Sequence, residues 1–326
     1  MQNLAPNLSL EIQKEKKAIR DAYGTALENQ AENFPNLIVL SADLRESMKV
    51  DTFQKKFSDR FIECGVAEQN MIGIAAGLGL SGNIAVTTSF AVFSPGRTWD
   101  QIRVSVCYSN SNVKIVGGHS GLLTGKDGAT HQALEDIAIT RVLPNMIVIN
   151  PCDYFQAIKA MEFGINHYGP VYLRGYREKT IQITTNQTPL EIGEPQIFKE
   201  GKDLTIISSG PIISEVLEAI NELENTHNLS IELINLPFIK PLNPEKIISS
   251  LHKTKKGVVI EEHQIFGGVG SSVLEKISDK VFYPIKLIGI NDTFGESGDY
   301  KELYEKYEIS SRHQVSKILQ FLKRVS

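Results

Sequence analysis

Residues 65–80, GVAEQNMIGIAAGLGL, decide the fold of the first half of this chain and contain its most informative residue, Glu68. They predict a turn followed by a helix of small and apolar residues, with one carboxylate in the first helical turn. A carboxylate between Val66 and Met71 is costly to bury in its ionised form, so Glu68 should reach solvent or pair with a group that takes its proton or charge. Seen alone, it would be an ordinary glutamate favoured by the helix dipole.

On both sides of this stretch, apolar runs alternate with amphipathic ones. An amphipathic helix is predicted over residues 10–33, and the apolar runs NLIVLSAD, IAVTTSF and VKIVGGH are predicted strands between helices. Strands that are almost wholly apolar are typical of a parallel sheet covered on both faces. This pattern continues to Arg177.

A polar stretch, residues 178–202, is predicted to be a linker, and a second, smaller alternation of strands and helices follows it. The sequence therefore predicts an α/β protein of two domains, each a mostly parallel sheet flanked by helices. We place the domains at residues 1–188 and 189–326.

Composition narrows the classes of partner. The chain has 326 residues and a formal charge of −4, which gives no electrostatic reason to expect nucleic acid or an anionic membrane. Cys64, Cys107 and Cys152 lack the spacing of a disulfide framework or a zinc site. There is no leader-like N-terminus, and no apolar run approaches about 18–20 residues. We expect a cytoplasmic protein whose partners are small molecules or other proteins.

In an open parallel sheet, ligands bind beyond the carboxyl ends of the strands, and polar motifs follow several of the predicted strands here. SADLRES follows the first of them, and SFAVF ends another. Phe90 and Phe93 in SFAVF are either plain core aromatics or a stacking platform for a flat ring. The site is therefore expected in the first domain.

Residues 117–132, GGHSGLLTGKDGATHQ, form a loop too long and too polar to be a mere connector. Taken singly, His119 or His131 would be a hydrogen-bonded structural histidine. Together with Asp127 in a glycine-rich loop they favour a functional role, because histidine can change protonation near neutral pH and can anchor phosphate or carbonyl oxygens.

Four motifs together resemble the pyrimidine-binding domain of the transketolase family: GVAEQNMIGIAAGL, SFAVF, GGHSGLLTGKDGATHQ and LPNMIVINPCD. GVVIEEHQIFGGVGSSV resembles that family's C-terminal domain, and the resemblance runs from about Arg20 to the C-terminus. It implies a thiamine diphosphate enzyme, in which a glutamate matching Glu68 bonds the aminopyrimidine ring nitrogen and promotes the imino tautomer that deprotonates the thiazolium. A poorly solvated carboxylic acid can share a proton with such a nitrogen.

The resemblance also implies roles for residues around the cofactor. Phe90 and Phe93 match aromatics that pack on the pyrimidine ring, and Asp43 matches an aspartate near the cofactor. Asp127 matches a residue that bonds a substrate hydroxyl, and His131 matches one close to the reacting carbons.

Four further positions match the sugar-phosphate ligands of transketolase, namely Arg20, Ser47, His119 and Arg177. Arg174 is the alternative to Arg177, because YLRGYRE offers both arginines. Guanidinium, hydroxyl and imidazole groups suit a dianionic phosphate.

The chain departs from the family pattern in two places. Full-length transketolases carry a GDG…N motif whose Asp and Asn hold Mg²⁺ and hence the diphosphate, and this chain has no GDG. A third family aromatic is missing near Gly96, where either Trp99 fills the gap or the pyrimidine pocket differs from that of the family. In the second domain, FGGVGSSV is a weak candidate for a phosphate-cradling loop, and we assign that domain to assembly.

The resemblance implies the C-terminal subunit of a split transketolase, which uses thiamine diphosphate and Mg²⁺ to move a two-carbon ketol unit between sugar phosphates, as in the pentose phosphate pathway. An N-terminal subunit would supply the metal ligands, in a two-fold symmetric heterotetramer. A 2-oxo acid dehydrogenase β-subunit and deoxyxylulose phosphate synthase are alternatives, although DGATHQ and His119 favour transketolase. The non-enzyme alternative is an assembly or regulatory subunit.

Overall fold

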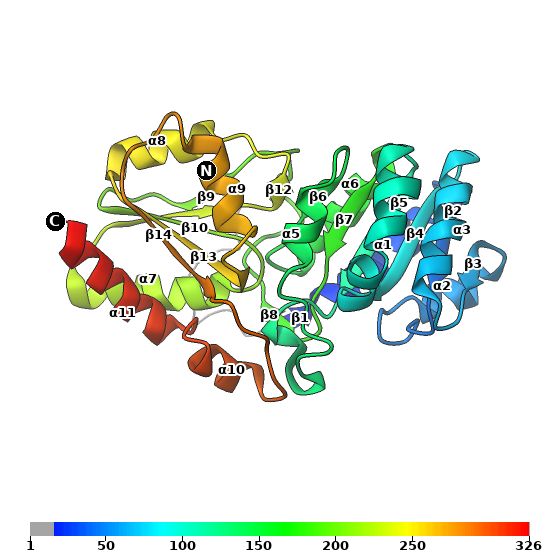
Figure 1. Ribbon diagram of the computed structural model, residues 1–326, viewed down its shortest axis with the longest axis horizontal. Coiled ribbons are helices and arrows are strands. Elements are labelled where there is room, and N and C mark those ends of the chain that lie inside the picture. The colour runs from blue at the N-terminus through cyan, green and yellow to red at the C-terminus, as the bar shows by residue number, and fades with distance from the viewer. Residues whose placement is uncertain (1–15, 326) are drawn as a thin grey trace.

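Two sheets, one for each half of the sequence, organise the computed structural model, which describes residues 16–325 (Figure 1). The N-terminal domain contains a seven-stranded sheet in the order β12-β6-β7-β5-β4-β2-β3. The C-terminal domain contains a five-stranded sheet in the order β14-β13-β10-β11-β9. Helices cover both faces of each sheet, which confirms the predicted fold class.

The N-terminal sheet is parallel from β3 to β6. Its strands are β2 (Leu37–Ser41), β3 (Phe61–Glu63), β4 (Ile84–Phe90), β5 (Val113–Gly118), β6 (Ile147–Ile149) and β7 (Val171–Arg174). Every residue of β4, β5 and β7 is buried, as expected for strands covered on both faces. Their mostly apolar sequence follows from this position, and polar residues among them, such as Lys114 and Arg174, are buried with hydrogen-bond partners.

Helices α1 and α6 pack together on one face of this sheet, and α3 lies on the other. The helical segments of the domain are α1 (Ile19–Gln30), α2 (Asp51–Lys56), α3 (Glu68–Leu80), α4 (Trp99–Gln101), α5 (Asp136–Arg141) and α6 (Tyr154–Asn166), with shorter or irregular turns η1 (Ser58–Arg60), η2 (Val92–Arg97), η3 (Ile102–Tyr108) and η4 (Leu122–Asp127). The predicted helix over residues 10–33 is therefore shorter, because residues 16–18 form β1 instead; residues 10–15 lie outside the described part.

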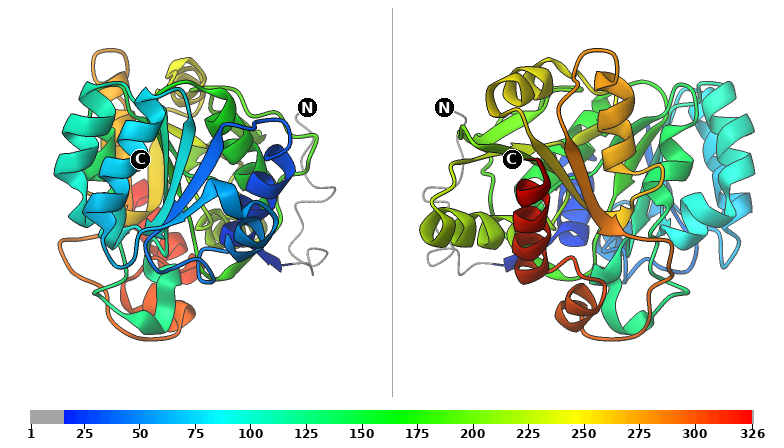
Figure 2. Two further views of the ribbon diagram at one scale, coloured as in Figure 1. Left: turned by 90° about the vertical axis from the view of Figure 1, so that its right-hand side faces the viewer. Right: turned by 60° about the vertical axis from the view of Figure 1, so that its left-hand side comes forward.

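In the C-terminal sheet, only β9 runs antiparallel to its neighbour. Its strands are β9 (Gln196–Lys199), β10 (Leu204–Ser208), β11 (Ile231–Asn235), β13 (Gly257–Gln264) and β14 (Ile285–Ile290). Its helices are α7 (Ile213–His227), α8 (Glu245–Thr254), α9 (Val269–Ile277), α10 (Tyr300–Lys306) and α11 (Ser311–Val325). Figure 2 shows α7 and α11 on one face of the sheet and α8 and α9 on the other.

Backbone pairing crosses between the two halves of the chain at one strand that the sequence did not predict. β12 (Phe238–Lys240) follows β11 in sequence but pairs antiparallel with β6 at the edge of the N-terminal sheet. The predicted linker also contains regular structure, since β8 (Lys179–Ile181) pairs antiparallel with β1 (Lys16–Ala18) and β9 joins the second sheet.

Candidate functional site

Glu68 is the first residue of α3 and its side chain is buried, with 3% of the residue's surface exposed. The turn before it is fixed by Glu63, whose Oε1 accepts hydrogen bonds from the backbone N–H of Asp43 at 2.8 Å and of Gly65 at 3.0 Å. Arg97 Nη1 donates to Glu68 Oε2 at 2.9 Å. Glu68 is therefore buried with one charged partner, Arg97, and sequence reasoning missed both Glu63 and Arg97.

The two predicted stacking aromatics lie next to each other where β4 ends. The ring centroids of Phe90 and Phe93 are 6.1 Å apart, and their planes differ by 23°. The guanidinium carbon of Arg97 is 4.8 Å from the Phe93 centroid. Trp99 instead donates from Nε1 to the Ile139 carbonyl at 2.6 Å, on α5. Thus Arg97, and not Trp99, lies beside the aromatic pair.

Both predicted histidines contact these aromatics. The ring centroids of His119 and His131 lie 3.7 Å and 5.8 Å from that of Phe90. His119 Nδ1 is buried without a hydrogen-bond partner among residues 16–325. Burial, followed by the charges of Arg20 and Arg177, lowers the pKa of His119 to about 3. His119 is therefore neutral near pH 7, so of the two properties of histidine considered from the sequence, a change of protonation and the anchoring of an oxygen, the structure favours the second for His119.

The backbone at His119 has φ of 54°, in the left-handed region that a non-glycine residue rarely adopts. The carbonyl of His119 accepts a hydrogen bond from Thr124 Oγ1 at 2.6 Å, which fastens the start of the glycine-rich loop to η4. Strained backbone of this kind persists where the surrounding contacts fix it, and it is common at binding sites.

Arg20 and Arg177 line the same groove, which has a volume of 580 Å³ and is also lined by Lys49 and Lys179. Arg20 Nη1 donates to the Ser47 carbonyl at 3.3 Å, so this predicted pair is brought together. The groove carries an excess of positive charge that suits an anionic group.

Arg177 is held by the glycine-rich loop. Its Nη1 donates to Asp127 Oδ1 at 2.8 Å and to the Thr124 carbonyl at 3.1 Å.

Asp43 and Ser47 line a separate small pocket of 230 Å³ on the loop that follows β2. The predicted site residues therefore fall into an aromatic and carboxylate part around Glu68 and a basic part around Arg20.

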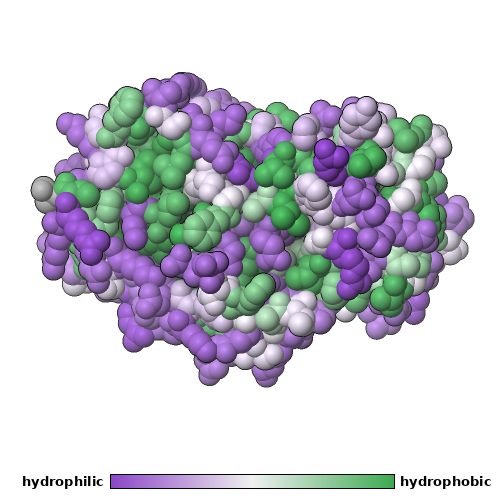
Figure 3. All heavy atoms as spheres, viewed as in Figure 1, coloured by the Kyte–Doolittle hydropathy of each residue, from purple (hydrophilic) through white to green (hydrophobic). Residues whose placement is uncertain are grey.

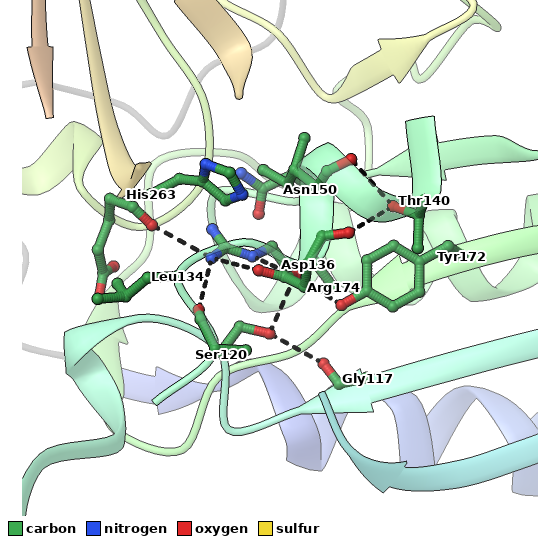
Figure 4. A network of polar contacts seen from close by, with 12 residues as sticks. Gly117, Ser120, Leu134, Asp136, Thr140, Asn150, Tyr172, Arg174 and His263 are labelled. Carbon is green, nitrogen blue, oxygen red and sulfur yellow. Dashed lines mark hydrogen bonds and ion pairs between the residues drawn. The ribbon is translucent and has the colours of Figure 1, made fainter. Parts of the chain in front are cut away.

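Arg174 does not face the groove. Its guanidinium is buried and forms a two-point ion pair with Asp136, through Nε at 2.8 Å and Nη2 at 3.0 Å (Figure 4). Nη1 donates to the Tyr176 hydroxyl at 2.7 Å, and Nη2 also donates to the Glu262 carbonyl at 3.2 Å. Because these contacts take up its donors inside the protein, Arg177 is the arginine of this pair that can meet a ligand.

The FGGVGSSV loop binds a carboxylate of this chain. Glu261 Oε2 accepts from the backbone N–H of Val269 at 2.6 Å, and Oε1 accepts from that of Gly270 at 3.0 Å, at the start of α9. A Cβ on Gly268 would lie 2.0 Å from Glu261 Oε2, so the glycine makes room for this contact. The helix N-terminus is already capped, and the loop is not a phosphate cradle.

Two family models match the chain. The transketolase pyrimidine-binding domain matches residues 15–181, and the transketolase C-terminal domain matches residues 193–313. The chain belongs to the transketolase family. Members of this family typically use thiamine diphosphate.

Several relatives of similar length support this assignment. A Methanocaldococcus jannaschii protein, described provisionally as a transketolase C-terminal section, is 41% identical over 94% of this chain and 97% of its own length. A subunit of a 6-deoxy-6-sulfo-D-fructose transketolase from Clostridium sp. is 34% identical over 95% and 96%. A subunit of an apulose-4-phosphate transketolase from Phocaeicola vulgatus is 31% identical over 94% and 98%.

Solved structures show the same fold. A split-gene transketolase, described as an inactive β4 tetramer, superposes with a TM-score of 0.87 at 36% identity, over 96% of this chain and all of that one. Transketolase from Campylobacter jejuni superposes with a TM-score of 0.80 at 22% identity, over 97% of this chain and 49% of that one.

No helix within residues 16–325 of the present chain has the length and apolar character needed to cross a bilayer.

Proposed function

We propose that this chain is the C-terminal subunit of a split transketolase, which transfers a two-carbon ketol unit from a ketose phosphate to an aldose phosphate. One observation carries the proposal: the buried Glu68 carboxylate, the Phe90 and Phe93 pair and the two histidines lie together beside a basic groove. This arrangement suits a flat, weakly basic ring next to an anionic sugar.

The pyrimidine end of thiamine diphosphate fits the residues present. Glu68 offers a buried carboxylate to a ring nitrogen, Phe90 and Phe93 offer a stacking surface, and the free Nδ1 of His119 is available to a polar ligand atom. When bound, thiamine diphosphate supplies the carbon nucleophile for ketol transfer. Glu68 would hold the proton at the ring nitrogen, and His131 would hold or move a proton at a substrate oxygen.

An anionic end on the sugar explains the basic part of the site. We infer that Arg20, His119 and Arg177, with Ser47, whose carbonyl accepts from Arg20, meet the terminal anion of the substrate, while Asp127 meets a hydroxyl. The relatives named for a sulfonated fructose and for apulose 4-phosphate support this inference, because both names describe a sugar with an anionic group. Arg177 and Asp127 already lie within hydrogen-bond distance of each other.

A separate N-terminal subunit would supply Mg²⁺, the diphosphate ligands and the other half of the site. The face of α3 that begins at Glu68 supports this, because Gly73 and Gly77 have open space above them. Val66 and Leu80 at its two ends are 73% and 58% exposed. Apolar and weakly polar residues lie along this side of the molecule, at the right in Figure 3. A heterotetramer would bury such a surface.

The test is reconstitution with the N-terminal subunit. The purified chain alone should show no ketol transfer and weak thiamine diphosphate binding, and the added subunit with Mg²⁺ should restore both. Acceptor pairs such as ribose 5-phosphate and ribose should be compared in the wild type and in Arg20→Ala, with the exposed Lys55→Ala as a control. Loss of a charged contact should weaken the phosphorylated acceptor about ten- to a hundredfold relative to its partner. Robust turnover by the isolated chain would overturn the proposal.

A further inference from the structure

A side chain of the C-terminal domain reaches into the glycine-rich loop of the candidate site. Glu262 lies near the end of β13, is 2% exposed, and its Oε1 accepts from the backbone N–H of Leu123 at 2.7 Å. The loop approaches so closely that a Cβ on Gly121 would lie 2.3 Å from Oε1, and Gly121 has φ of +71°. Only a glycine satisfies both demands at that position.

Leu123, whose backbone N–H donates to Glu262, lies in the same glycine-rich loop as His119 and Asp127 of the candidate site. Thr124, the next residue, bonds the carbonyl of His119 through Oγ1 and accepts from Arg177 through its own carbonyl. Asp127, the last residue of η4, pairs with Arg177. Through Leu123 and the adjacent Thr124, Glu262 is therefore connected to His119 and to Arg177 of the basic groove.

The C-terminal domain also supports this loop from a second side. Gln132 donates from Nε2 to the Glu296 carbonyl at 2.8 Å, and a Cβ on Gly128 would lie 2.4 Å from Ser297 Oγ. The groups in these two contacts are uncharged: the amide of Gln132 with the carbonyl of Glu296, and Gly128 with the Ser297 hydroxyl. Glu262 is the buried ionisable group among the contacts described here, and its second oxygen has no hydrogen-bond partner within residues 16–325.

From this geometry we propose that Glu262 is a positioning residue, through which the C-terminal domain holds η4 and so sets His119, Asp127 and Arg177 for the anionic end of the sugar. The C-terminal domain then contributes to substrate affinity without touching the substrate. The effect on the sugar rests on the proposed function, whereas the effect on the loop does not.

The neighbouring Glu261 provides a matched control. It is as deeply buried as Glu262, but both of its oxygens bond the start of α9 inside the C-terminal domain. Replacing either glutamate removes a buried carboxylate and lowers stability, so a loss of stability alone does not distinguish them. Only Glu262 is bonded to the loop of the site.

The experiment compares Glu262→Ala, Glu262→Gln and Glu261→Ala in the full chain and in the complex with the N-terminal subunit. Amide hydrogen exchange in the peptide covering residues 119–128 should become roughly three- to tenfold faster in Glu262→Ala, the expected effect of one lost buried hydrogen bond. It should stay near wild type in Glu262→Gln, whose amide oxygen can still accept from Leu123, and in Glu261→Ala. If Glu262→Ala does not fold, Glu262→Asp, which withdraws the acceptor, takes its place.

In the complex, KM for ribose 5-phosphate should rise by a similar factor in Glu262→Ala, with kcat changed less and with recovery in Glu262→Gln. Unchanged exchange in Glu262→Ala, or an equal increase in Glu261→Ala, would overturn the proposal. Faster exchange with an unchanged KM would limit Glu262 to a structural role and overturn it as well. Absence of ketol transfer in the wild-type complex would instead refute the proposed function, and the exchange comparison would still decide whether Glu262 holds the loop.

Discussion

At the scale of single residues, the partner of a buried carboxylate determines what it can do. Both carboxylate oxygens of Glu261 accept hydrogen bonds from backbone N–H groups at the start of α9. The carboxylate of Glu68 instead pairs with one side chain, that of Arg97, which can move away. The side chain of Arg97 is 50% exposed and that of Glu68 only 4%, so solvent reaches the guanidinium, whereas loss of this partner leaves a buried carboxylate that needs another one. In the proposed function, the ring nitrogen of the cofactor would take the place of the guanidinium as the partner of Glu68.

Glu68→Gln tests this role. The amide keeps the size and can still form a hydrogen bond, but it cannot hold the proton at the ring nitrogen. In the reconstituted complex, turnover should fall by roughly 10²–10⁴-fold, the usual range for a positioned acid or base. Proton exchange at the thiazolium carbon, followed by NMR, should slow in parallel, and Glu32→Gln on the exposed surface should change neither. Near-normal exchange in Glu68→Gln would remove Glu68 from the mechanism.

At the scale of elements, local patterns predicted most of the fold. The small-residue run after Glu68 becomes α3, and the apolar runs become β2, β4 and β5. The strand β12 was missed because its pairing with β6 depends on the packing of the two domains, which three residues of sequence do not encode.

The site was predicted less completely than the fold. The motifs indicated the aromatics and histidines, which the structure brings together. Arg97 and Glu262 were not indicated, because each acts on a residue far away in the sequence. The sequence could not show that His119 is neutral near pH 7, because its lowered pKa comes from burial, which depends on tertiary packing.

The exposed face of α3 leads to a prediction about assembly. Gly77→Glu should leave the chain folded, because nothing lies within 4 Å of the added Cβ and glycine is a poor helix former. It should prevent association with the N-terminal subunit, since it places a charge in the proposed interface. Sedimentation of the mixed subunits would measure this, with Gln320→Glu on α11 as the control. Normal association of Gly77→Glu would place the partner elsewhere.

At the scale of the whole molecule, two adjacent glutamates in β13 make stability depend on pH. Burial raises the pKa of Glu261 and of Glu262 from 4.5 to about 7. The folded state therefore keeps both protons over a range in which the unfolded chain loses them. The resulting stability is fully present below pH 4.5 and is lost as pH rises through about 7, on the order of 3 kcal/mol for each group.

The variant carrying both Glu261→Gln and Glu262→Gln tests this dependence, because amides do not ionise. Between pH 5 and about pH 8, the free energy of unfolding of the wild type should fall more steeply than that of the variant, as measured by urea denaturation. Parallel profiles would show that neither carboxyl titrates in this range.

The pairing of β12 with β6 has a consequence for the order in which the protein can be completed during synthesis. The ribosome makes the N-terminal strands first, but the edge of β6 stays unpaired until residues 238–240 have emerged. The backbone N–H of Leu123, in the glycine-rich loop that follows β5, likewise lacks its acceptor until Glu262 has been made. The N-terminal domain therefore cannot reach its final form as an independent nascent unit, and the last third of translation completes the site that the first half encodes.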